Sequence, residues 1–346
     1  MSWMLYGASG YTGRLILKEA LAVEDTLILA GHNAAALQAA AAGDGLEWRD
    51  FEPNTPNFTG VTAVLNAAGP FEKTAPPLMQ ACIAARIPYI DIASEYTTIQ
   101  KALALDEQAR NAGVTLLPGV GMAVLPTDSL AVRLVRELPL ATNLQIGVWT
   151  NSIATRGILK NTLPLLTSEG RVRTNGLLRP AHFADKTETF DFGFAKPEIL
   201  PLYPWRADVV TAGHSTQIPT IECFMHLPKA METAAKKLPG LLSSPLTQKL
   251  LAKWIDSQPA GPTREQRADS LTMVRVRARV GLQKPLEAGL SFGDPYEFTA
   301  RAAYMILKKA LEGELPTGFQ TPGLALGPDF VLTVPGVTAL EAVVAH

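Results

Sequence analysis

The chain has 346 residues, of which 47% are hydrophobic and 18% are charged, so it is too long for one nucleotide-binding unit and suits two domains with separate cores. Its formal net charge of -1 creates no field that would gather nucleic acid, which is therefore not expected as a partner. The two cysteines lie far apart in the sequence, and no apolar run is long enough to span a membrane. We expect a cytoplasmic protein with a small-molecule substrate.

Near the start of the chain, an apolar strand beginning at about Trp3 runs into three glycines, Gly7, Gly10 and Gly13, spaced GxxGxxG. Gly7 allows a tight turn, Gly10 lets backbone N–H groups approach a diphosphate, and Gly13 lets the next helix pack on the strand. That helix, expected over 12–22, points its N-terminus at the phosphates. The alternative is an ordinary glycine-rich turn. The expected cofactor-binding residues of this loop are Gly7, Ala8, Ser9, Gly10, Tyr11, Thr12, Gly13 and Arg14.

Up to about Gly121, apolar runs alternate with stretches rich in helix formers, which predicts a parallel sheet covered by helices. After the first strand, further strands are expected at 27–30, 46–49, 61–66, 88–92 and 114–117. Further helices are expected at 34–42, 75–86 and 97–110. The order predicts a six-strand, doubly wound α/β domain over residues 1–122.

Closely spaced Gly and Pro residues in 118–128 mark a hinge, which an amphipathic helix over 129–138 follows. Longer strands at 143–150 and 273–280 and a late helix over 301–312 predict an α+β second domain. That domain covers residues 123–346, and its C-terminal part can pack back on the first domain. Three arginines alternate with apolar residues in 273–280, so they form either a phosphate-binding face or a salt-bridged outer face.

The cofactor preference depends on the end of the second strand, where NAD-binding sites carry an acidic residue. This chain has His32 and Asn33 there. A carboxylate would repel the 2′-phosphate of NADP by about 4 kcal/mol at 4 Å and an effective dielectric of about 20, so its absence permits NADP. Ser9 and Arg14 supply further donors. The alternative is that His32 is a surface turn residue without a ligand.

The carboxyl ends of the next two strands should also face the ligand. Asp91 and Tyr96 follow the fifth strand and are candidate catalytic residues, although Asp91 can instead cap the next helix. The five histidines show no metal-binding spacing, and neither a CxxC nor a GxSxG motif occurs, so no metal is expected. The residues at the end of the fourth strand that are expected to bind the cofactor are Asn66, Ala67, Ala68, Gly69, Pro70 and Phe71.

Several motifs resemble the saccharopine dehydrogenase-like oxidoreductases. The N-terminal motifs are GASGYTGR, AGHN, NAAGPF and YIDIASE. Those that resemble the bacterial branch with trans-acting enoyl reductases are PGVGMAVLPTDSLA, TRG, VRTNGLL, HSTQIPTIE, AGPTREQR and GFQTPGLALGPDF. The resemblance implies a Rossmann domain joined to a saccharopine-reductase-type α+β domain, NADP as the cofactor, and hydride transfer.

Within these motifs, Asp128, Arg156 and His214 are the substrate-side candidates. Their alternative roles are a helix N-cap, a surface ion pair and a satisfied, partly buried histidine, respectively. The chain also departs from the family pattern, because His32 stands where relatives commonly have Arg, and Gly213 stands where a Tyr is common.

The predicted function is NADPH-dependent reduction of a polarised C=C bond in an apolar or thioester-linked substrate, because the expected ligand-facing segments carry few cations. Tyr96 or His214 would then supply the proton. One alternative is a C=N or C–N oxidoreductase that acts on amino acids. Another is a non-catalytic NADP-binding protein that contacts a membrane, an acyl carrier or another protein through 238–255. Homodimer formation is a further expectation.

Overall fold

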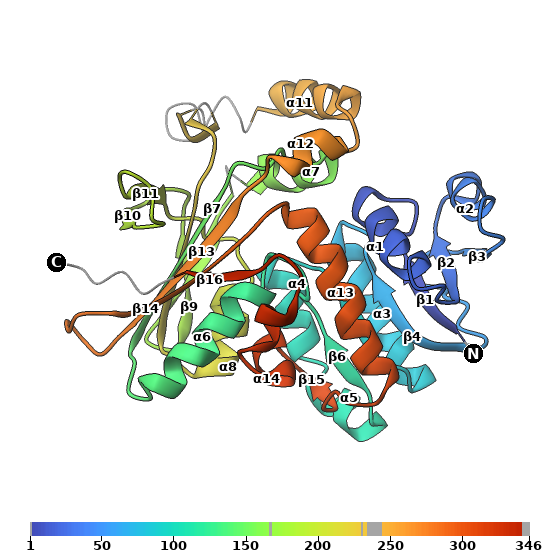
Figure 1. Ribbon diagram of the computed structural model, residues 1–346, viewed down its shortest axis with the longest axis horizontal. Coiled ribbons are helices and arrows are strands. Elements are labelled where there is room, and N and C mark those ends of the chain that lie inside the picture. Colours follow the sequence, from blue (N-terminus) through green and yellow to red (C-terminus); the bar gives the residue numbers. More distant parts are fainter. Residues whose placement is uncertain (1, 166–167, 230, 234–243, 341–346) are drawn as a thin grey trace. The chain divides into compact units, whose positions relative to one another are not determined.

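A computed structural model describes residues 2–165, 168–229, 231–233 and 244–340 (Figure 1). The chain divides into two compact units. Unit 1 comprises Met1–Leu125 and Tyr296–Pro335, and unit 2 comprises Pro126–Pro295 and Gly336–His346. The first crossing, after Leu125, lies inside the predicted hinge. Residues 296–335 belong to unit 1, so a single cut at residue 122 does not describe the division.

The described residues of unit 1 form a seven-stranded sheet in the order β15-β6-β5-β4-β1-β2-β3, in which all neighbours are parallel. Its strands are β1 (Ser2–Tyr6), β2 (Leu27–Gly31), β3 (Glu47–Asp50), β4 (Val61–Asn66), β5 (Tyr89–Asp91), β6 (Thr115–Leu117) and β15 (Gly318–Phe319). The six predicted strands are confirmed. β15 adds a seventh, which joins β6 from 200 residues further along the chain.

The helices of unit 1 are α1 (Tyr11–Leu21), α2 (Ala34–Ala41), α3 (Phe71–Ala85), α4 (Tyr96–Leu103), α5 (Asp106–Ala112), α13 (Pro295–Leu311), α14 (Pro322–Leu326) and the 3-10 turn η1 (Phe330–Thr333). The single helix predicted over 97–110 is wrong, since the chain breaks between α4 and α5. Asp106 begins α5, and its carboxylate accepts the N–H of Phe319 in β15 at 2.7 Å. The break between α4 and α5 therefore positions the Asp106 carboxylate, which holds β15 at the edge of the sheet.

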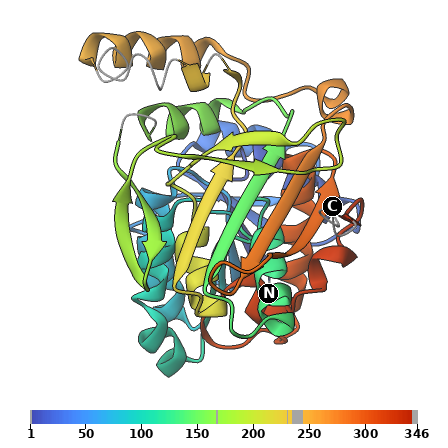
Figure 2. The ribbon, with the colours of Figure 1, turned by 90° about the vertical axis from the view of Figure 1, so that its left-hand side faces the viewer.

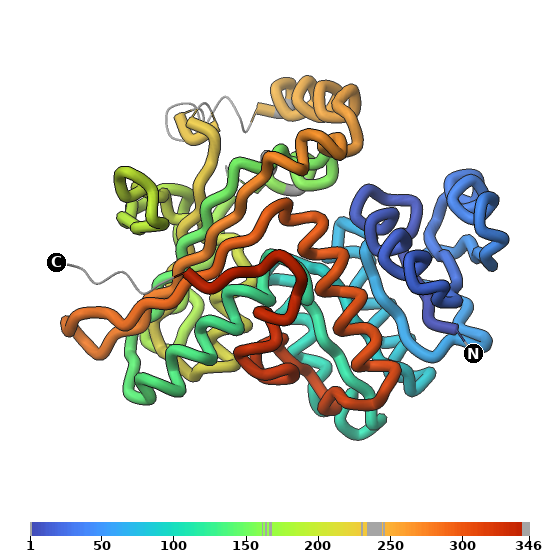
Figure 3. The backbone as a smooth tube through the Cα atoms, in the orientation of Figure 1, coloured from blue at the N-terminus to red at the C-terminus, as the bar shows by residue number. Residues whose placement is uncertain are grey.

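Helix α13 runs beside α1 although nearly 300 residues separate their starts (Figure 3). The rings of Tyr11 and Tyr296 meet edge to face with centroids 5.2 Å apart. The Tyr304 hydroxyl donates to Asp25 at 2.8 Å, and the Trp3 indole donates to the same carboxylate oxygen at 3.2 Å. Residues 296–335 are thus an integral part of the nucleotide-binding unit.

Unit 2 has a mixed seven-stranded sheet in the order β16-β14-β13-β7-β12-β8-β9, and Figure 2 shows its central strands side by side. Only the β7–β12 pair is parallel among the described pairs. The strands of unit 2, including the separate β10–β11 ribbon, are β7 (Asn143–Thr150), β8 (Gly170–Thr174), β9 (Leu177–Ala181), β10 (Thr187–Phe190), β11 (Glu198–Pro201), β12 (Thr220–Met225), β13 (Thr272–Arg279), β14 (Leu286–Phe292) and β16 (Thr338–Leu340).

The helices of unit 2 are α6 (Leu125–Glu137), α7 (Arg156–Leu165), α8 (Asp208–Thr216), α11 (Pro245–Ser257) and α12 (Arg264–Ala268). Helix α11 contains the described part of the segment predicted to contact a membrane or partner, whereas 238–243 lie outside the described residues. It packs against α7 and leaves Leu246, Leu250 and Trp254 exposed. In the part of the chain that the structure describes, no helix is long and apolar enough to cross a membrane.

An aromatic cluster of Phe190, Phe192 and Phe224 covers one face of the second sheet. The arginines of β13 pack on this side. Arg277 lies 4.4 Å above the Phe190 ring and pairs with Glu287 at 2.8 Å, while Arg275 donates to the Asp191 carbonyl at 2.9 Å. These partners support the salt-bridged alternative over a phosphate-binding face.

Candidate functional site

The glycine loop between β1 and α1 has the geometry that its spacing predicts. Gly7 adopts φ +90°, and a Cβ there would lie 2.7 Å from the Ala68 nitrogen. A Cβ on Gly13 would overlap the Gly7 carbonyl oxygen. Gly7 is therefore required for the turn and for close contact with the segment after β4, and Gly13 is required for the close packing of α1 on the loop.

The N-terminus of α1 fits a diphosphate. Gly10 is the exposed N-cap, no side chain caps the helix there, and its first turn has no acidic residue. The helix has 11 residues, which is long enough for its dipole and uncapped N–H groups to favour an anion. Ala8 is buried, Ser9 and Thr12 are half-buried, and Arg14 is exposed beside this loop in the sequence. The loop can therefore hold the diphosphate of a dinucleotide mainly through its backbone.

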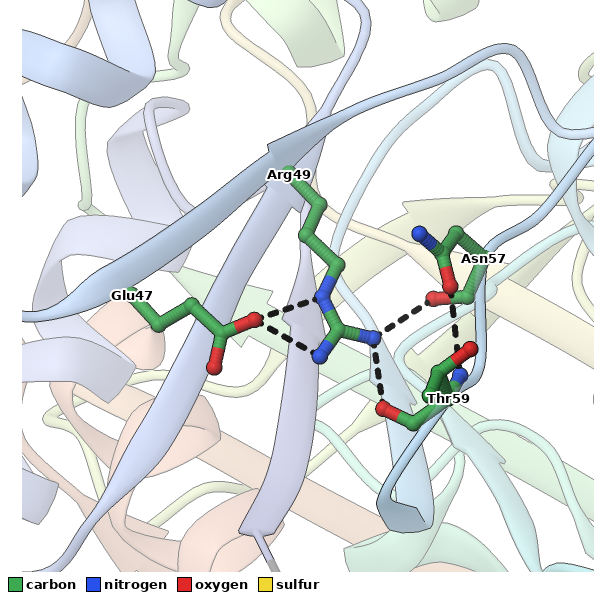
Figure 4. Close-up of polar contacts among 4 residues, drawn as sticks. All are labelled: Glu47, Arg49, Asn57 and Thr59. Atoms are coloured by element: carbon green, nitrogen blue, oxygen red, sulfur yellow. Dashed lines mark hydrogen bonds and ion pairs between the residues drawn. The ribbon is translucent and has the colours of Figure 1, made fainter.

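At the end of β2, His32 and Asn33 are both exposed. The Asn33 side chain caps α2, since its Oδ1 accepts the Ala36 N–H at 3.0 Å, so only its NH₂ group is left for a ligand. The nearby cation on β3, Arg49, is held by Glu47 and by the backbone carbonyls of the loop after β3 (Figure 4). Its role is structural.

Asn66, at the end of β4, is fully buried, and its hydrogen bonds lie inside unit 1. Its Oδ1 accepts the Ala68 N–H at 2.9 Å, while its Nδ2 donates to the Tyr89 hydroxyl at 3.0 Å and to Thr74 at 3.3 Å. Thr74 in turn donates to the Ala68 carbonyl at 2.6 Å. Asn66 therefore shapes the Ala67–Phe71 segment, and it is the backbone of that segment that meets Gly7.

Asp91, at the end of β5, continues this network. Its Oδ2 accepts the Tyr89 hydroxyl at 2.8 Å, and its Oδ1 accepts the N–H groups of Ala93 at 2.9 Å and Gly119 at 3.0 Å. The residue is 0% exposed. Asp91 does not cap the next helix, because the N-cap of α4 is Glu95. We call Thr74, Asn66, Tyr89 and Asp91 the strand-end network, and it ties together the loops after β4, β5 and β6.

Burial sets the charge state of this network. Burial raises the pKa of Asp91 to about 6, against the hydrogen bonds from Ala93, Gly119 and Tyr89, which lower it. Burial and the Asp91 charge raise the pKa of Tyr89 well above its usual range, so Tyr89 stays a neutral donor. Tyr89 and Thr74 were missed in the sequence, because a hydrogen-bond partner on a neighbouring strand, such as Tyr89 in β5, or on the following helix, such as Thr74 in α3, leaves no periodic signal.

The other predicted residues of unit 1 surround this network. Tyr96 is the first residue of α4 and is half-buried, so its phenol is the more accessible of the two candidate catalytic groups here. Ala67 and Ala68 are half-buried, Gly69 and Pro70 are exposed, and Phe71 is buried at the start of α3. The structure brings the glycine loop and the Ala67–Ala68 backbone together.

Unit 2 holds the three substrate-side candidates on different helices. Asp128 is fully buried in the first turn of α6, not at its N-cap, and accepts the Ser215 hydroxyl of α8 at 2.6 Å. His214 lies half-buried in the last turn of α8. Arg156 begins α7 and donates to the Asp256 carbonyl at 3.2 Å, which links α7 to α11. The Asp128–Ser215 bond thus places Asp128 close to the His214 segment, whereas the one contact found for the Arg156 side chain serves the packing of α7.

Metal and thiol chemistry find no support among the residues that the structure describes. No group of three His, Cys, Asp or Glu side chains there could hold a metal ion. Cys82 and Cys223 are both buried, and burial raises the pKa of each thiol well above its usual value. Neither thiol is therefore poised to act as a nucleophile.

Comparison with known proteins gives one family match and a fold. Residues 3–117 match the family model of the saccharopine dehydrogenase NADP binding domain. No curated protein sequence matches the chain. Among solved structures, apo saccharopine dehydrogenase (L-Glu forming) from Saccharomyces cerevisiae superposes with a TM-score of 0.66 at 11% identity, covering 98% of this chain and 100% of that one.

Other dehydrogenases are more distant. A probable dehydrogenase from Thermotoga maritima has a TM-score of 0.46 at 12% identity, covering 96% of this chain and 94% of that chain. A myo-inositol dehydrogenase from Corynebacterium glutamicum has a TM-score of 0.44 at 11% sequence identity, and the alignment covers 99% of each chain. The yeast enzyme confirms the two-part α/β fold, and the family match assigns the cofactor. Residues 3–117 thus form an NADP-binding domain similar to that of saccharopine dehydrogenase, and the chain that carries them is an NAD(P)-dependent oxidoreductase.

Proposed function

We propose that the protein reduces a polarised C=C bond in an apolar or thioester-linked substrate, with NADPH as the hydride donor. The supporting observation is the makeup of the segments after β4, β5 and β6, which are Ala67–Phe71, Ile92–Tyr96 and Pro118–Val124. They contain no Lys or Arg. The buried carboxylate beside them, Asp91, already accepts three hydrogen bonds from within unit 1. An amino-dicarboxylate needs cationic partners, and these segments offer none.

In this proposal the chain's own residues bind and orient. The glycine loop holds the cofactor diphosphate, and the strand-end network fixes the loops beside it. When bound, NADPH supplies the hydride for the β-carbon. A proton must then reach the α-carbon, and Tyr96 and His214 are the candidate donors. Asp91 is a positioning residue, because its side chain has no exposed surface.

A second candidate function is a C=N or C–N oxidoreductase that acts on amino acids, and one observation favours it. In unit 2 the guanidinium of Arg173 has a buried Nε with no hydrogen-bond partner, as expected for a group that receives a substrate anion. The yeast enzyme with the same fold is a saccharopine dehydrogenase by name.

The test is NADPH oxidation by the purified protein with two sets of acceptors. One set is enoyl thioesters of several chain lengths, and the other is α-keto acids together with lysine or glutamate. Turnover with the thioesters supports the proposal. Turnover only with the amino-acid pairs would establish the second function, and tight NADPH binding without any turnover would favour a non-catalytic protein.

A further inference from the structure

Arg173 lies in β8 with its side chain on the face of the second sheet that α8 covers. Its neighbour Val172 packs against the aromatic cluster on the other face, and successive side chains of a strand alternate between faces. A Cβ on Gly213 in α8 would lie 2.8 Å from both Cζ and Nη1 of Arg173. The guanidinium therefore rests against the Gly213 backbone, in the space that any side chain at position 213 would need.

This guanidinium lacks a partner within the described residues. Its Nε is buried and has no hydrogen-bond acceptor. Burial alone lowers the pKa of Arg173, and no carboxylate contributes to raise it. A buried donor without an acceptor costs free energy, and more so when it carries charge. Arg173 is thus a cation in a partly desolvated position, and its Nε makes no hydrogen bond with the described residues.

Three other arginines of unit 2 have a carboxylate partner. Arg171, two residues earlier on the same strand, pairs with Glu169. Arg206 is buried and pairs with Asp208 at 2.7 Å, and Arg277 pairs with Glu287 at 2.8 Å. Each of these three cations has a carboxylate within ion-pair distance inside the unit. The Nε atoms of Arg277 and Arg279 also lack a hydrogen-bond partner among the described residues, so what distinguishes Arg173 is its contact with the Gly213 backbone.

The helix beneath Arg173 is held in place from a second direction. Ser215 donates to the buried Asp128 at 2.6 Å. Gly213 and Ser215 are two residues apart, and successive helical residues turn by about 100°, so the two contacts lie on opposite sides of α8. The backbone against which Arg173 rests is therefore fixed before any ligand arrives.

We infer that Arg173, lying against Gly213, is a binding group for a carboxylate of the substrate. A planar guanidinium binds a carboxylate by donating two parallel hydrogen bonds to its oxygens. One guanidinium also balances the single charge of a carboxylate, whereas a phosphate dianion calls for a second cation. Glycine at position 213 creates the site, because a larger residue would displace the guanidinium.

This inference rests on the second candidate function, which the same Arg173 observation favours, and it names a substrate feature. Its test needs no turnover. Glutarate is titrated into the full-length protein by calorimetry, with and without NADP⁺, and acetate and inorganic phosphate serve as comparison anions. The wild-type protein should bind glutarate at one site. Arg173→Met and Gly213→Ala should each weaken binding at least about tenfold, and Arg173→Lys should weaken it less.

Arg171→Met is the matched control, since Arg171 shares the strand and face but has a carboxylate partner. It should change the glutarate Kd by less than about twofold. Circular dichroism and melting curves verify the fold of each variant. Absence of glutarate binding to the wild-type protein, equal binding by Arg173→Met, or a preference for phosphate would each overturn the inference. Glutarate binding that depends on Arg173 in a protein that reduces no enoyl thioester would instead overturn the proposed C=C reaction alone.

Discussion

The strand-end network of unit 1 and Arg173 of unit 2 differ in how their buried polar atoms are satisfied. In unit 1, Asn66, Tyr89 and Asp91 pass hydrogen bonds along a closed chain that ends on backbone groups of three loops. In unit 2, Arg173 has a buried Nε that finds no acceptor among the described residues. The first arrangement is typical of residues that hold the fold in place. The second is typical of a donor whose acceptor belongs to a ligand.

This difference separates residues that position a site from residues that bind a ligand. A fully hydrogen-bonded network stabilises the fold, since each hydrogen bond contributes more to stability when its neighbours in the network are present. An unsatisfied cation weakens the fold until an anion arrives. Truncation should therefore have opposite consequences in the two units, and the variants below are chosen to break or sharpen that contrast.

The largest effect is expected for Asp91→Ala. The change leaves the N–H groups of Ala93 and Gly119 and the Tyr89 hydroxyl without their acceptor in a buried place, which should lower the free energy of unfolding by about 4 kcal/mol. Urea denaturation measures it. Asp44→Ala, at an exposed carboxylate, is the control and should stay within about 0.5 kcal/mol. A loss below about 1 kcal/mol at Asp91 would contradict the scaffold role.

The free energy of unfolding should depend on pH through the titration of the Asp91 carboxyl group. The pKa of Asp91 is about 6 in the folded protein and about 3.9 in an unfolded chain. Because the pKa is higher in the folded protein, the protonated carboxyl group adds to the free energy of unfolding. This contribution is fully present below the unfolded-state pKa and is lost as the pH rises through the folded-state pKa. Between pH 4 and 7 the wild-type protein should lose about 2 kcal/mol relative to Asp91→Asn. Parallel curves for the two proteins would show that Asp91 does not titrate in this window.

Much of unit 1 could be predicted from the sequence because its signals are local. Six strands follow from the alternation of apolar runs and helix formers, and the glycine spacing encodes a backbone geometry directly. β15 could not be predicted. It has two residues, and its position depends on the Asp106 contact with Phe319 and on pairing with Leu116, which no periodicity records.

The candidate site was predictable only in part, for a related reason. Position at a strand end singled out Asn66 and Asp91 as candidates, but it could not show that their side chains form hydrogen bonds with Tyr89 inside unit 1. The sequence also singled out Gly213 as a departure from the family pattern. It gave no sign that Arg173, 40 residues earlier in the chain, fills the space, because this contact exists only in the folded unit.

The glycine loop of unit 1 should bind an anion through backbone N–H groups, whereas Arg173 in unit 2 would do so through a charged side chain. Gly10→Val should weaken NADPH binding at least about 100-fold, because the side chain would occupy the diphosphate position. The fold should survive, since Gly10 has φ -71° and a Cβ there would approach only the Gly7 oxygen, at 3.1 Å. Fluorescence titration measures the affinity, and Gly43→Ala, in open space, is the control. Affinity like that of the wild type would refute the diphosphate site.

His32 should tune the affinity for the 2′-phosphate. NADPH should bind more tightly than NADH, and His32→Asp should weaken NADPH about tenfold, since solvent at this exposed position screens the repulsion. His32→Arg should strengthen it by a similar factor. NADH affinity should change little in both variants and serves as the internal control. Equal shifts for the two cofactors would mean that His32 does not face the 2′ position.

The smallest expected effect tests directly whether the Arg173 side chain stabilises the fold. Arg173→Met removes the unpartnered guanidinium and keeps an apolar stem against Gly213, so the free energy of unfolding should stay constant or rise by up to about 1 kcal/mol. The matched variant Arg277→Met loses the Glu287 ion pair and the Phe190 contact and should lose about 1 to 2 kcal/mol. Urea denaturation of both variants without ligand gives the comparison. Destabilisation of Arg173→Met by as much as Arg277→Met would assign Arg173 to the fold, because a side chain kept for a ligand contributes its binding energy only when that ligand is present.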